Sequence, residues 1–212
     1  MQLEQIYTHI DHTVLKQTTT WAQVQKLCDE AIQGKAASVC IPPCYVAKAK
    51  EYTNGAMPIC TVIGFPNGYQ TTMVKLMETK EALANGADEI DMVINLCDVK
   101  NGEWDKVSHE IKALKHACGN RVLKVIVETC YLTEEEKVRL CQIVTEAKAD
   151  YIKTSTGFGS AGATVEDVIL FRKECGTDVK IKAAGGIRTV EDAESMLSAG
   201  ADRLGSSALL AR

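Results

Sequence analysis

Eight short runs of β-branched and other apolar residues recur along the chain, and helical patterns fill the segments between them. The runs lie at residues 8–13, 37–42, 58–65, 88–95, 122–129, 150–156, 179–185 and 202–207. Strand–helix repeats require a parallel sheet, because each return crosses the sheet in a helix. Eight such units within 212 residues predict an α/β fold, a (β/α)8 TIM barrel that forms one domain over residues 1–212. The alternative is an open doubly wound sheet, but no G-x-G-x-x-G follows the first run.

The segments between the runs carry the spacing and the end signals of α-helices. One predicted helix places its apolar residues at i, i+3, i+4 and i+7, so they share a face. These residues are Trp21, Val24, Leu27, Cys28, Ala31 and Ile32. Two further helices begin with capping boxes, Thr133 with Glu136 and Thr189 with Asp192. Helices therefore alternate with strands as a parallel barrel requires.

The charge and hydropathy of the chain argue against several kinds of partner. The formal net charge is −4 and the pI is near 5.6, which argues against binding nucleic acid or an anionic membrane surface. No apolar run has the length of a membrane span, and the first residues lack the form of a signal peptide. We therefore expect a cytoplasmic protein that does not enter a membrane.

The nine cysteines are scattered along the sequence. In a chain of this length we expect reduced, buried thiols rather than a disulfide framework. Cys40 and Cys44 are the only close pair, and the sequence places no second pair and no histidine near them. We therefore expect no metal site.

Two lysines occupy predicted strands. In the run 179–185 the apolar side chains share one face, which must pack on helices, so Lys182 points into the barrel near its carboxyl-terminal mouth. Lys153 occupies the corresponding level on the preceding strand. Active sites of this fold lie at that mouth, so the two lysines are candidates for chemistry.

Two neighbouring ammonium groups favour a neutral amine. Lysine normally titrates near pH ~10.4, and a neighbouring ammonium and partial desolvation both lower that pKa. Only the neutral amine attacks a carbonyl, so the pair indicates a Schiff-base nucleophile. The alternative is that each lysine snorkels to solvent or pairs with a carboxylate. The spacing does not decide which lysine would be the nucleophile.

Four further charged side chains are candidates for the same site. Asp91 lies in the middle of its run, where a carboxylate is costly unless paired, and a lysine is its natural partner. A salt bridge that only sets the register of the barrel is the alternative. Lys124 and Glu128 share an inward face and are expected to support the first three residues. Asp11, on the first run, is a weaker candidate.

The loops after the last strands are rich in glycine. Glycine lets backbone amides approach an anion, and the N-terminus of a helix points its amides at the anion, so these loops predict a phosphate site. One loop leads into a helix near Val190, and the other is expected to open a terminal helical segment. The phosphate-binding candidates are Gly157, Gly185, Gly186, Arg188, Gly205, Ser206 and Ser207.

The chain resembles the deoxyribose-phosphate aldolase family, whose members are class I, Schiff-base aldolases. The matching segments are DYIKTSTGF, VKIKAAGGIRT, ADEIDMVINL, KVIVET, IDHTVLK and LGSSALL. They cover nearly the whole chain in the family's order, and the combination of KTSTGF with KAAGGIRT is specific.

The resemblance implies reversible cleavage of 2-deoxy-D-ribose 5-phosphate to D-glyceraldehyde 3-phosphate and acetaldehyde. It implies that Lys153 forms the Schiff base, that Lys182 perturbs it and assists proton transfer, and that Asp91 donates and accepts protons. The glycine loops match the family's phosphate-binding positions. The implied partners are small sugar phosphates and aldehydes, with no cofactor. The sequence carries no diagnostic interface, but parallel barrels often pair through their helices, so a homodimer or homotetramer is the assembly to expect.

Two departures from the family and three alternatives remain at this point. Some members carry a lysine where this chain has Phe158, and several end in a tail with a terminal tyrosine, whereas this sequence stops at LLAR. We expect the first to weaken phosphate contact; the second means that the tail is missing here or that the enzyme works without it. The alternatives are another Schiff-base aldolase or transaldolase, a catalytically silent barrel that senses a phosphorylated metabolite, and a phosphate-binding isomerase.

Overall fold

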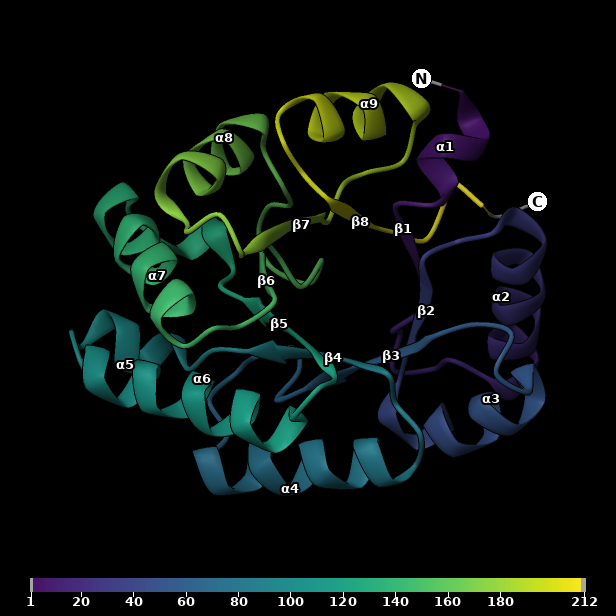
Figure 1. Cartoon of the computed structure of the whole chain (residues 1–212), viewed down its shortest axis with the longest axis horizontal. Helices are drawn as coiled ribbons and strands as arrows, with labels where there is room; N and C mark the ends of the chain where they lie inside the picture. Colours follow the sequence, from purple (N-terminus) through teal and green to yellow (C-terminus); the bar gives the residue numbers. More distant parts are fainter. Residues whose placement is uncertain (1, 211–212) are drawn as a thin grey trace.

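The chain forms a closed barrel of eight parallel strands, as the sequence repeat predicts. The computed structural model describes residues 2–210. Figure 1 shows the strands as an inner ring with the helices outside it. Each strand pairs with the next one in sequence, and β8 pairs with β1 to close the ring.

All eight predicted strands are present, each within its predicted run. They are β1 Ile10–Thr13, β2 Ser38–Ile41, β3 Ile59–Ile63, β4 Glu89–Val93, β5 Val122–Ile126, β6 Tyr151–Lys153, β7 Lys180–Ala184 and β8 Arg203–Ser206. All eight are shorter than their runs, and in every run except the first the last residues leave the sheet and begin the loop that follows the strand.

The helices cover the outer face of the barrel. They are α1 Leu3–Tyr7, α2 Trp21–Gly34, α3 Val46–Thr53, α4 Thr72–Ala84, α5 Leu96–Lys100, α6 Trp104–Cys118, α7 Glu134–Glu146, α8 Val165–Glu174 and α9 Val190–Ser198, with short 3₁₀ turns η1 Pro43–Tyr45 and η2 Thr129–Tyr131. Within residues 2–210 no helix is long and apolar enough to cross a membrane.

Both predicted capping boxes are formed. The Thr133 side chain accepts a hydrogen bond from the Glu136 amide at the start of α7, and Thr189 does the same with Asp192 at the start of α9. Each box satisfies amides that the first helical turn leaves without a partner. The helices therefore begin where the sequence predicts.

The apolar face of α2 is narrower than predicted. Val24, Leu27, Cys28 and Ala31 are buried, whereas Ile32 is 38% exposed. Ile32 lies at the edge of the predicted stripe at 100° per residue, and that edge faces away from the strands.

The main hydrophobic core lies between the strands and the helices. Ile90 and Met92 on β4, and Ile181 and Ala183 on β7, are fully buried in it. Since side chains alternate, their neighbours along each strand point to the barrel interior. The interior is therefore where the charged strand residues gather.

The prediction that all the cysteines are buried is wrong for part of the set. All nine thiols are free, but Cys44 and Cys97 are exposed, and Cys130 and Cys175 are half-buried. Cys44 and Cys97 lie in helical turns that follow β2 and β4 rather than in the strands. Position in a connecting turn, which composition does not reveal, decides their exposure.

Candidate active site

Lys153 and Lys182 lie side by side in the barrel interior, as predicted. They are register partners on β6 and β7. The Lys153 Nζ donates to Asp91 Oδ2 at 2.7 Å, and the Lys182 Nζ donates to the same oxygen at 2.8 Å. Two ammonium groups therefore share one carboxylate oxygen.

Asp91 holds a third lysine through its other oxygen. The Lys124 Nζ lies 2.9 Å from Asp91 Oδ1, and the Cys60 thiol lies 3.1 Å from that oxygen. Asp91 is completely buried, and burial by itself would raise its pKa. The ammonium groups of Lys124, Lys153 and Lys182 outweigh burial and hold the pKa well below its usual range. Asp91 is therefore an ionised carboxylate that accepts hydrogen bonds from all three lysines.

Asp11 belongs to the same network, although the sequence ranked it below Asp91. Its Oδ2 accepts a short hydrogen bond from Lys182 Nζ, and its Oδ1 lies 2.6 Å from Arg203 Nη1 and 2.7 Å from Ser38 Oγ. Burial would raise the Asp11 pKa, but the surrounding cations lower it. Asp11 thus ties Lys182 to the lower part of the barrel.

Lys124 and Lys182 remain ammonium ions inside the protein. Both side chains have no exposed surface, and burial alone would lower the pKa of each. The carboxylates of Asp11 and Asp91 outweigh burial and raise the pKa of both lysines. Lys182 is therefore a fixed positive charge beside Lys153.

Glu128 lies elsewhere than predicted. Strand β5 ends at Ile126, so the alternation that would have aligned Glu128 with Lys124 does not continue. Glu128 adopts a left-handed backbone with φ 55° and is buried. Its carboxylate accepts hydrogen bonds from the amide (3.1 Å) and the hydroxyl of Thr156. These two hydrogen bonds hold the loop that follows Lys153.

The glycine loops after β6 and β7 meet at the mouth of the barrel. Gly157, Gly185 and Gly186 all have positive φ, between 83° and 86°, which disfavours any residue with a side chain. A Cβ on Gly185 would lie 3.6 Å from the Gly157 Cα and 3.0 Å from the Gly162 Cα. The backbones of these loops therefore lie close together, which the absence of side chains at the three glycines allows.

The loop after β8 is joined to the loop after β7. The hydroxyl of Ser206 donates to the Ile187 carbonyl oxygen at 2.9 Å, and a Cβ on Gly205 would lie 2.9 Å from the Ala184 Cβ. Ser207 is exposed beside them. The predicted terminal helical segment is wrong as far as residue 210, because residues 207–210 form bends. No helix dipole acts at this loop within the described chain.

Arg188 lies at the start of α9 with an exposed side chain. The carboxylate of Asp192 accepts hydrogen bonds from the amides of Arg188 and Thr189, both at 2.9 Å. The amide of Arg188, which the sequence assigned to an anion, is therefore already bonded to Asp192. The amides of the preceding glycines are the better candidates.

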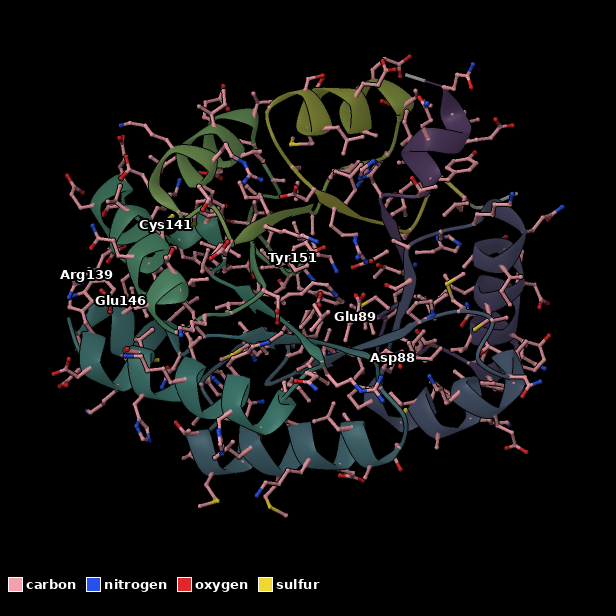
Figure 2. The ribbon with its side chains drawn as sticks, viewed as in Figure 1. Asp88, Glu89, Arg139, Cys141, Glu146 and Tyr151 are labelled. Carbon is pink, nitrogen blue, oxygen red and sulfur yellow. The ribbon has the colours of Figure 1, made fainter. Side chains whose placement is uncertain are left out.

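The sequence analysis missed two charged residues of this network, Glu89 and Arg203. Glu89 Oε2 lies 2.5 Å from Lys124 Nζ and 3.4 Å from Arg203 Nη1. Figure 2 labels Glu89 and Tyr151 inside the ring of strands, whereas Arg139 and Glu146 lie out on α7. The signal was available: Glu89 is two residues before Asp91, so it faces the same side of β4.

Phe158 faces an apolar wall. Its ring packs edge-on against Phe65 with 5.3 Å between centroids. Both rings, with Leu15 and Val62, line a cavity of about 320 Å³ beside the ends of β1, β2 and β3. The position that is lysine in some members of the family here contributes apolar surface to the mouth.

Within residues 2–210, two sets of three buried side chains have possible metal-ligand atoms within 4.8 Å of one another. They are Cys40, Cys60 and Asp91, and Asp11, Cys60 and Glu89. Cys60 and Asp91 both contact the Lys124 ammonium, at 3.2 and 2.9 Å. A metal cation there would have to displace bound ammonium groups, so the donor set does not fit a metal centre.

Comparison with known proteins identifies the family. A family model described as DeoC/LacD family aldolase matches residues 6–212. The chain belongs to this family of aldolases. The deoxyribose-phosphate aldolase of Clostridium botulinum (strain Alaska E43 / Type E3) is 58% identical over 207 residues, covering 98% of this chain and 94% of that protein. The deoxyribose-phosphate aldolase of Clostridioides difficile (strain 630) is 55% identical with the same coverage of both chains.

Solved structures of aldolases share the fold of this aldolase closely. The tetrameric deoxyribose phosphate aldolase from Aeropyrum pernix has a TM-score of 0.91 and 30% identity, over 99% of this chain and 89% of that chain. An aldolase called QR15 has a TM-score of 0.93 and 40% identity, over 97% of this chain and 92% of that chain.

Proposed function

We propose that this aldolase cleaves 2-deoxy-D-ribose 5-phosphate reversibly to D-glyceraldehyde 3-phosphate and acetaldehyde, with Lys153 as the Schiff-base amine. The observation that carries the proposal is the shared carboxylate oxygen, 2.7 Å from Lys153 Nζ and 2.8 Å from Lys182 Nζ. The Lys182 ammonium beside Lys153 favours loss of the Lys153 proton. High identity to named deoxyribose-phosphate aldolases supports the substrate.

In the proposed reaction the neutral Lys153 amine attacks C1 of the open-chain sugar phosphate. The carbinolamine loses water to give an iminium cation, whose charge lies where the ammonium charge was, 2.7 Å from Asp91 Oδ2 in the resting site. That cation withdraws electrons, so the C2–C3 bond breaks as the C3 hydroxyl loses its proton. The enamine is then protonated and hydrolysed to release acetaldehyde.

We assign proton transfer to Asp91 and Lys182, which are in contact at 2.8 Å. Lys124 and Asp11 are proposed to hold this pair in place, because they contact Asp91 and Lys182 respectively. Such fixed charges stabilise developing charge without reorganising during the reaction.

The phosphate is proposed to bind the glycine loops at the mouth. The positive φ values and close approach of the loops support this, and the exposed side chains of Arg188 and Ser207 flank them. Ser206 is proposed to join the loops of β7 and β8, and Gly205 allows their close packing. Binding there, far from the breaking bond, positions the substrate.

We also propose that the enzyme works in the cytoplasm as a single-domain homodimer or homotetramer. Free thiols at all nine cysteines are typical of a reducing compartment. A tetrameric relative from Aeropyrum pernix supports a multimer.

Borohydride trapping tests the proposal. Incubation with acetaldehyde and borohydride should add one reduced two-carbon group to the peptide that contains Lys153, as measured by mass spectrometry. Lys153→Ala should lose the adduct and the turnover of deoxyribose 5-phosphate while keeping the circular dichroism spectrum. An adduct on Lys182 instead, or no reducible adduct in the wild type, would contradict the proposal.

A further inference from the structure

The ion pairs inside the barrel continue below the proposed catalytic residues. Glu89 lies one inward-facing position before Asp91 on β4, at the amino-terminal end of the strand. Lys124 bridges the two carboxylates, 2.5 Å from Glu89 and 2.9 Å from Asp91. Arg203, at the start of β8, lies 3.4 Å from Glu89 and 2.6 Å from Asp11. A connected column of charge therefore runs from this end of the barrel to its mouth.

The column holds one more cation than anions. Its four cations and three anions are Lys124, Lys153, Lys182 and Arg203, with Asp11, Glu89 and Asp91. Other titratable groups facing it are the thiols of Cys40 on β2 and Cys60 on β3 and the Tyr151 hydroxyl on β6, which carry no charge when protonated.

Lys153 contacts the fewest carboxylates of the four cations in this column. Lys124, Lys182 and Arg203 each contact at least two carboxylates, whereas Lys153 contacts Asp91 and shares that oxygen with Lys182. The Lys153 side chain also has a small exposed area at the mouth, and those of Lys124 and Lys182 have none. Loss of its proton leaves the column with equal numbers of cations and anions.

We propose that Glu89 is a positioning residue that holds Lys124 against Asp91 and, by supplying the third negative charge of the column, sets the pH at which Lys153 forms its Schiff base. The inference rests on the proposed function. Glu89 acts through Lys124 and Asp91, because it makes no contact with Lys153 among the described ion pairs. Arg203 acts at the same end with the opposite sign.

The test is the pH dependence of borohydride trapping with acetaldehyde at Lys153. Glu89→Gln leaves two excess cations, so the half-maximal pH should fall by about one unit. Arg203→Gln leaves none, so the half-maximal pH should rise by a similar amount. Glu110→Gln is the matched control, because Glu110 is also buried and paired with a buried lysine, but it lies outside the barrel.

Opposite shifts in Glu89→Gln and Arg203→Gln, with none in Glu110→Gln, are the expected result, and disturbed packing would not produce opposite signs. If Glu89→Gln does not fold, an upward shift in Arg203→Gln still supports the charge balance. An unchanged midpoint in either folded variant, or shifts of one sign, overturns the inference and leaves the proposed function intact. A wild type without an adduct on Lys153 overturns both.

Discussion

Lysines are buried both in the barrel interior and between helices α4 and α6, and their pKa values are shifted in opposite directions in the two places. Lys75, on α4, has no exposed surface and contacts one carboxylate, Glu110 on α6, at 2.9 Å, and the Val93 carbonyl oxygen at 2.8 Å. Burial lowers the pKa of Lys75 and raises that of Glu110. Lys182, equally buried inside the barrel, contacts Asp11 and Asp91, and its pKa is raised.

The difference shows that burial alone does not set the charge of a lysine. One carboxylate does not compensate for the loss of water around Lys75, whereas two do so for Lys182. Lys153 contacts one carboxylate that it shares with Lys182. Its surroundings therefore have fewer anions than those of its neighbour, which is the arrangement that a nucleophilic amine needs.

The largest expected effect comes from removing the shared carboxylate. Asp91→Asn should lower the free energy of unfolding by roughly 3–5 kcal/mol, because three buried ammonium groups lose their common partner. Glu110→Gln should cost less, about 1–3 kcal/mol, because the pKa of Lys75 is already lowered and its amine can become neutral. Urea denaturation at pH 7 measures both. Equal costs, or a larger cost at Glu110, would break the comparison.

The pH dependence of that stability should also differ between the two places. The Asp91 pKa is below its ordinary 3.8, so its contribution is present above pH 3.8 and is lost as pH falls through the folded value. The Lys182 pKa is above its ordinary 10.5, so its contribution is present below pH 10.5 and is lost as pH rises through the folded value. The cost of Asp91→Asn should therefore be nearly constant between about pH 5 and 9 and shrink under strong acid.

The outer pair should be replaceable. A Lys75→Met, Glu110→Leu double variant should be within about 1–2 kcal/mol of wild-type stability, since apolar replacement of a buried ion pair is often neutral or stabilising. The pKa of Glu110 in the folded protein lies above its ordinary value of 4.5. The wild type therefore loses stability as pH rises from 4.5 through the folded pKa of Glu110. The variant should therefore gain relative to the wild type above pH 4.5. Urea denaturation of the double variant and the wild type at pH 4 and pH 7 measures this difference. A gain in the free energy of unfolding of the variant at pH 4 but not at pH 7 would contradict the prediction.

The smallest effect is expected at an exposed pair. Lys106 and Glu103 lie 3.4 Å apart, with 62% and 48% of their side chains exposed. Lys106→Ala should change the free energy of unfolding by less than about 0.5 kcal/mol, because water and salt screen the pair. A larger loss of stability in thermal denaturation would mean that burial does not decide how much each lysine contributes to the free energy of unfolding.

The strands were predictable because short β-branched and apolar runs recur along the chain with helical patterns between them, and side chains within a run alternate between two faces. The apolar face of residues 179–185 required Lys182 to point inward, and the parallel register then placed Lys153 beside it. Asp91 followed from the same alternation on β4. The direction in which each of these side chains points could therefore be derived from the sequence of its own strand.

Contacts between distant segments could not be derived in this way. Glu89 reaches Arg203 on β8, and the Lys75 partner Glu110 is 35 positions away on another helix, so no local period specifies either pair. The position of Glu128 was predicted wrongly because β5 ends two residues before it. Glu128 itself has a left-handed backbone conformation, which a glutamate does not indicate in the sequence.

The midpoint of adduct formation in Lys182→Gln tests the central claim, that a fixed ammonium beside Lys153 keeps Lys153 reactive. The variant removes a positive charge and leaves the Asp91 Oδ2 oxygen to Lys153, and both changes favour the protonated Lys153. The pH of half-maximal borohydride trapping with acetaldehyde should therefore rise by about one unit or more. A wild-type midpoint in the variant, with only the turnover of deoxyribose 5-phosphate reduced, would contradict the account and leave Lys182 as a proton carrier alone.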